Sequence, residues 1–277
     1  RADAIAWLAN RAGMIPDQPL PPARRKPQRA RPSVVPLDPS VVRYVNACEK
    51  ILWGRTGAPV RDWLHARGFD DDLLRANHVG ADPGRAMMSR QRGLPYGHSL
   101  AATFPALDPE SNVQYVQARY LEPIGSDKYD NPAGSLGSNP RLAWTRTPDG
   151  HTTASVLLVT EGIPDALTAA GAGYAAVGIL GSQAPDDRVA MTLAGHAENS
   201  GQQMVAIVDA DPAGRAWGFR LAGLLEARGH ILNVVEPPDG LDLNGWASRC
   251  PLWTTALAAE PLHPIEPPET RLAPLTT

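Results

Sequence analysis

The sequence has little cysteine and no long apolar run. Its two cysteines, Cys48 and Cys250, lie 202 positions apart (250 minus 48) in a chain of 277 residues and share no motif. Two cysteines are too few for a four-cysteine zinc site or a disulfide framework. No apolar run approaches about 18 residues, which argues against a membrane span, and no basic-then-apolar leader is present. We therefore expect a soluble protein with two unpaired thiols in a reducing cytosol.

Lysine is also scarce, and the charge is unevenly divided. Only three of the 26 basic residues are lysines: Lys26, Lys50 and Lys128. Residues 1–150 carry 20 Lys and Arg against 15 Asp and Glu (+5), and residues 151–260 carry 5 against 12 (−7). Such a division suggests that one half meets a polyanion while the other concentrates carboxylates, for instance around metal ions. Ordinary solvated surface charge is the alternative interpretation.

Prolines mark the expected linkers. Eight prolines and several arginines between residues 16 and 39 predict an extended linker, either a plain tether or a segment that touches nucleic acid. A short helix is expected before it, over residues 1–15. Five prolines in residues 261–277 predict a loose tail. Two folded parts are expected between these segments, over residues 40–150 and 151–260.

The first folded part has mixed patterns. Apolar spacing predicts helices over residues 39–53, 59–66 and 71–77, the last capped by Asp70. Residues 112–121 (NVQYVQARYL) read as a strand, and glycine and proline are frequent over residues 80–150. We expect a small α+β lobe.

The second folded part alternates strands with helices. Short apolar runs cover residues 155–160, 174–180, 203–208 and 230–235, with helical stretches over 164–170, 185–194 and 213–228. Apolar runs without polar alternation are typical of strands buried on both faces. The predicted fold is therefore α/β, with a mostly parallel sheet flanked by helices and preceded by the smaller lobe.

Acidic residues follow the ends of these strands. Glu161 comes directly after the first strand, with Asp165 four residues later, and Asp209 and Asp211 follow the third. Asp242 belongs to an acidic segment after the fourth strand. In extended backbone, residues two apart point the same way, and clustered carboxylates suit Mg²⁺ or Mn²⁺. The alternative is that Asp165, Asp211 and Asp242 only cap helices or stabilise turns.

The order of these motifs resembles a known family. EGIPDAL (161–167), LGS (180–182), DADPAG (209–214) and DLN (242–244) together resemble a Toprim domain, more narrowly the catalytic core of bacterial DnaG-type DNA primases and their phage or plasmid relatives. Residues 61–85 are similar to the segment that opens the primase core, and DKYDNP (127–132) resembles a basic motif of its first lobe. The similarity covers about residues 40–250.

The resemblance implies roles for individual residues. Glu161, Asp209 and Asp211 would be catalytic and, assisted by Asp165 and Asp242, would bind Mg²⁺ or Mn²⁺. Template or nucleotide would be bound by five further residues: Arg119, Lys128, Asn131, Gly181 and Ser182. The implied partners are single-stranded DNA, NTPs and a replicative helicase, in the bacterial cytosol. The implied activity is the synthesis of short RNA primers on single-stranded DNA by metal-dependent nucleotidyl transfer.

Two departures from the family pattern stand out. Asn244 occupies a position where many members have another acidic residue, which bears on a second metal position. The family's zinc-binding module is missing, so no zinc is expected in this chain, and residues 1–15 resemble the end of that module. Two other functions remain open: another Toprim enzyme, such as a nuclease or topoisomerase, or a non-catalytic nucleic-acid-binding module.

Overall fold

The computed structural model describes residues 34–259, apart from residues 126, 151 and 182–184. The predictions for residues 1–15, for most of the linker and for the tail lie outside this range. The helices have the following bounds: α2 Pro39–Leu52, α3 Ala58–His65, α4 Asp71–Ala76, α5 Ile163–Gly171, α6 Asp187–Ser200, α7 Pro212–Glu226, the 3₁₀ helix η1 Pro238–Gly240, α8 Leu243–Arg249 and α9 Trp253–Ala259. The strands are β1 Gly80–Asp82, β2 Ala101–Leu107, β3 Val113–Ile124, β4 Asp127–Asp130, β5 Leu142–Trp144, β6 Thr153–Thr160, β7 Tyr174–Ile179, β8 Gln203–Ile207 and β9 Leu232–Val235.

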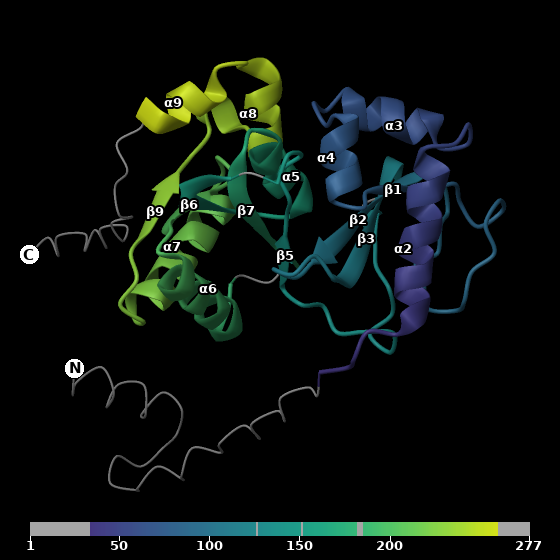
Figure 1. The fold of residues 1–277 in the computed structure, drawn as a ribbon, viewed down its shortest axis with the longest axis horizontal. Helices are drawn as coiled ribbons and strands as arrows, with labels where there is room; N and C mark the ends of the chain where they lie inside the picture. Colours follow the sequence, from purple (N-terminus) through teal and green to yellow (C-terminus); the bar gives the residue numbers. More distant parts are fainter. Residues whose placement is uncertain (1–33, 126, 151, 182–184, 260–277) are drawn as a thin grey trace, which may run out of the picture. The chain divides into compact units, whose positions relative to one another are not determined.

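All of these strands belong to one sheet (Figure 1). Its order is β4-β3-β2-β5-β7-β6-β8-β9, with β1 paired to β2. The pairs β6–β7, β6–β8 and β8–β9 are parallel, and the remaining pairs are antiparallel. The predicted α/β fold is therefore confirmed. The sequence did not predict the short strand β5, which pairs with both β2 and β7 and makes the sheet continuous.

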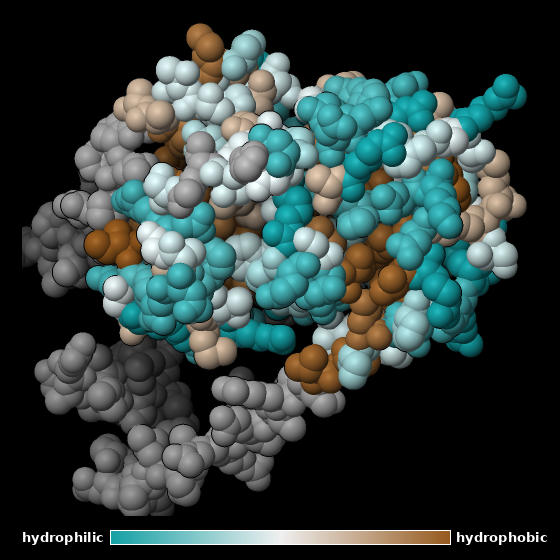
Figure 2. All heavy atoms as spheres, in the orientation of Figure 1, coloured by the Kyte–Doolittle hydropathy of each residue, from teal (hydrophilic) through white to brown (hydrophobic). Residues whose placement is uncertain are grey.

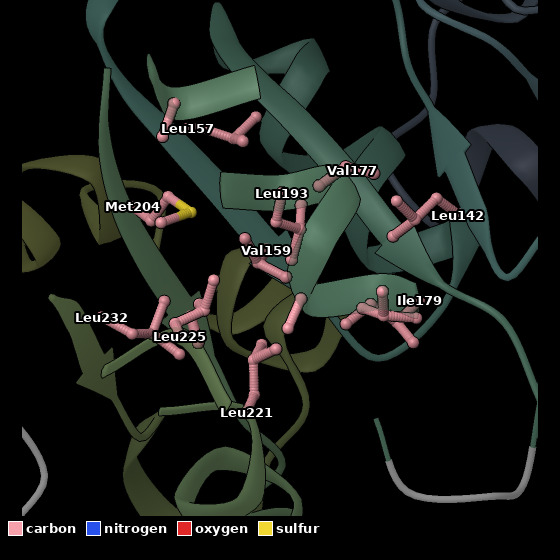
Figure 3. Packing of buried hydrophobic residues seen from close by; sticks show 14 of the residues in the cluster. Leu142, Leu157, Val159, Val177, Ile179, Leu193, Met204, Leu221, Leu225 and Leu232 are labelled. Carbon is pink, nitrogen blue, oxygen red and sulfur yellow. The ribbon is translucent and has the colours of Figure 1, made fainter. Parts of the chain in front are cut away.

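The parallel strands are buried on both faces. Within β6, Leu157 and Val159 belong to one apolar cluster while Leu158 belongs to another, as expected when successive side chains point to opposite faces. Helices α6 and α7 contribute Leu193, Leu221 and Leu225 to the first cluster, which Figure 3 shows packed against side chains of the sheet. Helices α5, α8 and α9 contribute to the second. Double-sided burial explains why these strands read as continuous apolar runs.

Local signals fix most helix ends. Asp70 accepts a hydrogen bond from the Leu73 backbone N–H at 2.8 Å, which confirms the predicted cap of α4. Helix α6 extends six residues beyond the predicted end at residue 194. The polar sequence GHAENS hid this extension, but Ala197 still packs on the core, and Gly201 ends the helix with a φ of 69°.

A third apolar cluster connects the two parts of the chain. Phe69, Leu73 and Phe104 of the first part pack with Ile163 and Leu167 of α5. On the face shown in Figure 2, hydrophilic residues cover most of the described surface, and hydrophobic residues form smaller patches. No helix within the described residues is both long and apolar enough to cross a membrane.

Candidate active site

The carboxyl ends of three parallel strands form an acidic edge. Residues Thr160 of β6 and Ile207 of β8 are paired, and Ile207 is also paired with Val235 of β9. The chain therefore leaves these strands side by side. Glu161 follows β6 and Asp209 follows β8 by two residues, so the sheet brings together carboxylates that lie 48 positions apart.

Hydrogen bonds hold the turn after β8. The Asp209 backbone N–H donates to Glu161 Oε1 at 3.3 Å. Asp211 caps α7 by accepting from the Gly214 N–H at 2.8 Å. A Cβ on Gly214 would lie 2.2 Å from the Asp209 carbonyl oxygen, far inside contact distance. The glycine of DADPAG is therefore required because α7 begins against the backbone of Asp209.

Two glycines, Gly162 and Gly178, shape the turn after β6. Gly162 has a φ of 122°, which disfavours any residue with a side chain. Gly178 on the adjacent strand β7 leaves room for this turn, because its Cβ would lie 2.4 Å from the Gly162 carbonyl oxygen. The backbone thus places Glu161 beside β7 and β8.

The carboxylates at this edge affect one another's ionisation. Burial, and then the charges of Asp209 and Asp211, raise the pKa of Glu161 to about 7. Burial, and then Asp242, raise the pKa of Asp165 to about 7. The pKa of Asp209 is raised by burial and by Asp242 and Asp211. A bound proton or a nearby cation would therefore relieve the unfavourable negative charge of each of these carboxylates.

This donor set fits a divalent cation in chemistry. It supplies hard carboxylate oxygens from Glu161, Asp165, Asp209, Asp211 and Asp242, whose mutual repulsion a cation would relieve. As the side chains stand, however, no group of three or more His, Cys, Asp or Glu within the described residues is arranged to hold a metal ion. Asp211 and Asp242 also serve as helix caps. Cation binding therefore requires these side chains to turn toward a common point.

A cavity of about 740 Å³ opens beside Glu161. Glu161, Gly162 and Gly181 line it from the acidic edge, and Asn131 and Tyr129 line it from the β4 region. Helix α7 supplies Ala213, Ala216, Trp217 and Arg220, which recur at helical spacing. Trp217 and Arg220 were not predicted as site residues from the sequence. That spacing after DADPAG was the signal that could have indicated them.

The remaining predicted binding residues occupy different places. Arg119 on β3 lies outside the cavity lining, with its guanidinium carbon 5.5 Å from the Trp63 ring and 5.6 Å from the Tyr129 ring. The positive charge of Arg119 lowers the pKa of Asp165 and so opposes part of the rise caused by burial. Lys128 on β4 is exposed and does not line the cavity. Ser182 lies outside the described residues.

Asn244 makes a buried contact with the first part of the chain. Its side-chain oxygen accepts from Arg67 Nη1 at 3.0 Å, and its amide nitrogen donates to the Arg67 carbonyl and to Thr168 Oγ1, both at 3.0 Å. Its backbone N–H donates to Asp165 Oδ1 at 3.0 Å. Asn244, which departs from the family pattern, therefore uses its side chain in hydrogen bonds within the protein.

Comparison with known proteins shows a similarity in the second part of the chain. The Toprim-like family matches residues 158–246. These residues are similar to that family and include strands β7, β8 and β9 of the parallel part of the sheet. They contain Glu161, Asp209, Asp211 and Asp242, but not Arg119, Lys128 or Asn131. No curated protein matches the chain.

Solved structures extend the likeness to the first part. A DNA primase domain from Pseudomonas aeruginosa is 16% identical, with a TM-score of 0.66, over 81% of this chain and 79% of that one. A DnaG primase catalytic domain bound to ssDNA is 19% identical, with a TM-score of 0.62, over 79% of each chain. The RNA polymerase domain of Mycobacterium tuberculosis DnaG, in complex with a DNA oligomer carrying a 6-nucleotide overhang, is 19% identical, with a TM-score of 0.61, over 81% and 80%. The chain thus has the fold of a DnaG catalytic core.

Proposed function

We propose that this chain is the catalytic core of a DNA primase, which joins ribonucleotides on a single-stranded DNA template with Mg²⁺ or Mn²⁺. One observation carries the proposal. Glu161 of the acidic edge lines the same cavity as Tyr129 and Asn131 of the β4 region. The DnaG cores with the same fold include one bound to ssDNA and one bound to a DNA oligomer.

The carboxylates of the acidic edge would bind the divalent cation. Glu161, Asp209 and Asp211 would hold the divalent cation, with Asp165 and Asp242 assisting. A bound cation would supply charge to activate the attacking 3′-hydroxyl and to stabilise the pyrophosphate that leaves. Glu161 has a pKa of about 7, so it can also hold or release a proton at neutral pH.

The first part of the chain would bind the polyanions. Asn131 lies at the cavity wall, and Arg119 and Lys128 lie on the neighbouring strands β3 and β4. Phosphates of template or NTP would be held there through charge and hydrogen bonds. Gly181 lines the cavity and leaves space for a ligand. A role for Ser182 and an interaction with a replicative helicase remain predictions.

A primer-extension assay tests this proposal without requiring initiation. Purified protein, an RNA primer annealed to a DNA template, labelled NTPs and Mg²⁺ or Mn²⁺ should yield extended primers. Glu161→Ala and Asp209→Ala should reduce extension by about a hundredfold or more, because each removes a carboxylate proposed to hold the divalent cation. Glu226→Ala is a matched control, since Glu226 is exposed at the far end of α7 from Asp211.

The same assay separates the rival functions. Shortened DNA without NTPs would identify a nuclease. Template binding without extension, unaffected by metal and by Glu161→Ala, would identify a non-catalytic binding module. Either result would reject the primase proposal.

A further inference from the structure

Arg67 and Asn244 connect the two parts of the chain beside the acidic edge. Arg67 lies in the turn after α3, and Asn244 lies in the first turn of α8, 177 positions later. Asn244 is 5% exposed. Its three side-chain hydrogen bonds, to Arg67 twice and to Thr168 once, each measure 3.0 Å.

The chemistry of the partners fixes the orientation of the Asn244 amide. A guanidinium only donates and a carbonyl only accepts, so the amide oxygen must face Arg67 Nη1 and the nitrogen must face the Arg67 carbonyl. A carboxylate at this position could accept from Arg67 but could not donate to its carbonyl. Asparagine is therefore matched to this contact in a way that aspartate is not.

The contact extends to the acidic edge. The Asn244 backbone N–H donates to Asp165 Oδ1, and Thr168, one helical turn after Asp165 on α5, accepts from the Asn244 side chain. Arg67 is held in turn by the Trp63 ring, 4.4 Å from its guanidinium carbon. Asn244 thus lies between Arg67 and the Asp165 carboxylate.

We propose that Asn244 is a positioning residue, which holds the Asp165 carboxylate at the acidic edge and fixes it relative to Arg67. This inference rests on the proposed function, because Asp165 matters for chemistry only if the edge binds a cation. Groups that orient metal-binding carboxylates affect metal affinity without contacting the metal.

The chain offers a matched control in Asn77. It is 3% exposed and also makes three side-chain hydrogen bonds, to Leu73 and twice to Arg146. None of them reaches the acidic edge. Asn77→Ala and Asn244→Ala therefore remove the same number of buried side-chain hydrogen bonds. Asn244→Ala keeps the backbone N–H that donates to Asp165, but it removes the side-chain contacts to Arg67 and Thr168 that hold this N–H in place.

The first experiment measures Mn²⁺ binding to the full chain by paramagnetic resonance and calorimetry. Asn244→Ala should weaken Mn²⁺ binding by about tenfold or more, whereas Asn77→Ala should leave it unchanged at a similar loss of thermal stability. Equal weakening by both variants, or none by Asn244→Ala, would overturn the inference. If the wild-type chain bound no Mn²⁺ and extended no primer, the proposed function itself would fail.

The second experiment tests the bridge without any metal. Arg67→Met, Asn244→Ala and the double variant are compared by urea unfolding in EDTA. If the two residues depend on each other, the double variant should lose less stability than the sum of the single losses. Strict additivity would show that Arg67 and Asn244 do not act together, and would reject the bridge even in an active enzyme.

Discussion

Asp165 is a carboxyl group whose ionisation is unfavourable for folding and whose proposed role is to assist cation binding. Burial and the nearby charge of Asp242 raise its pKa from 3.8 to about 7. The folded state therefore favours the protonated form. Stability from this group is complete below about pH 4 and is lost as the pH rises toward 7.

The substitution Asp165→Asn should therefore stabilise the metal-free protein at pH 8 by about 1 kcal/mol or more, and should have little effect near pH 4. The amide oxygen can still accept from Asn244. Urea unfolding in EDTA at both pH values measures this difference, with the exposed Asp72→Asn as control. An equal effect at both pH values would contradict the assigned ionisation.

Gly214 is a position where the absence of a Cβ atom is required by the fold. A Cβ there would meet the Asp209 carbonyl oxygen at 2.2 Å, whereas a Cβ on Gly223, also in α7, would meet nothing within 4 Å. Gly214→Ala should displace the turn that carries Asp209 and cost about 1–3 kcal/mol, and it should reduce extension. Gly223→Ala should instead stabilise α7 by up to about 1 kcal/mol. Thermal unfolding and primer extension of both variants check this contrast.

At the scale of elements, helix α7 joins a structural and a proposed catalytic role in one residue. Asp211 caps the helix through Gly214 and also belongs to the acidic edge. Asparagine caps a helix about as well as aspartate but carries no charge.

Asp211→Asn should therefore keep the thermal stability of the wild type while reducing extension by about tenfold or more. Asp211→Ala should lose both the activity and about 1 kcal/mol of stability. Thermal unfolding and primer extension measured on the same preparations separate the two roles. Full activity in Asp211→Asn would leave capping as the function of this side chain.

The predictability of the elements follows from how locally they are determined. The parallel strands were predicted because burial on both faces leaves continuous apolar runs. Strand β2 was missed because its alanines and Pro105 have low strand propensity, although all seven residues are buried. Strand β5 has only three residues, too few for any periodicity.

Some residues of the candidate site could also be predicted from local sequence, and others could not. Glu161, Asp209 and Asp211 could be selected because they follow strands within recognisable motifs. The contact between Arg67 and Asn244 could not, because 177 positions separate its partners and no local pattern encodes it. The cavity wall formed by Trp217 and Arg220 depends on how α7 packs, which spacing alone does not determine.

At the scale of the whole molecule, the charge division predicts how DNA binding responds to salt. Lys128 is exposed on edge strand β4, and Lys50 is exposed at the end of α2. If Lys128 contacts phosphate, Lys128→Ala should weaken single-stranded DNA binding and reduce the slope of log affinity against log salt by about one. Lys50→Ala should leave the slope unchanged. Fluorescence anisotropy over a salt series measures both, and equal slopes for the two variants would contradict a template contact at Lys128.

The continuity of the sheet through β5 has a mechanical consequence. Backbone pairing runs from β2 through β5 to β7, so the strands that carry the proposed polyanion-binding residues cannot separate from the acidic edge without breaking that pairing. If the proposed function holds, the residues that bind the template would keep a fixed distance from the acidic edge. Each proposed nucleotide addition would then require the nucleic acid to move past a rigid protein frame.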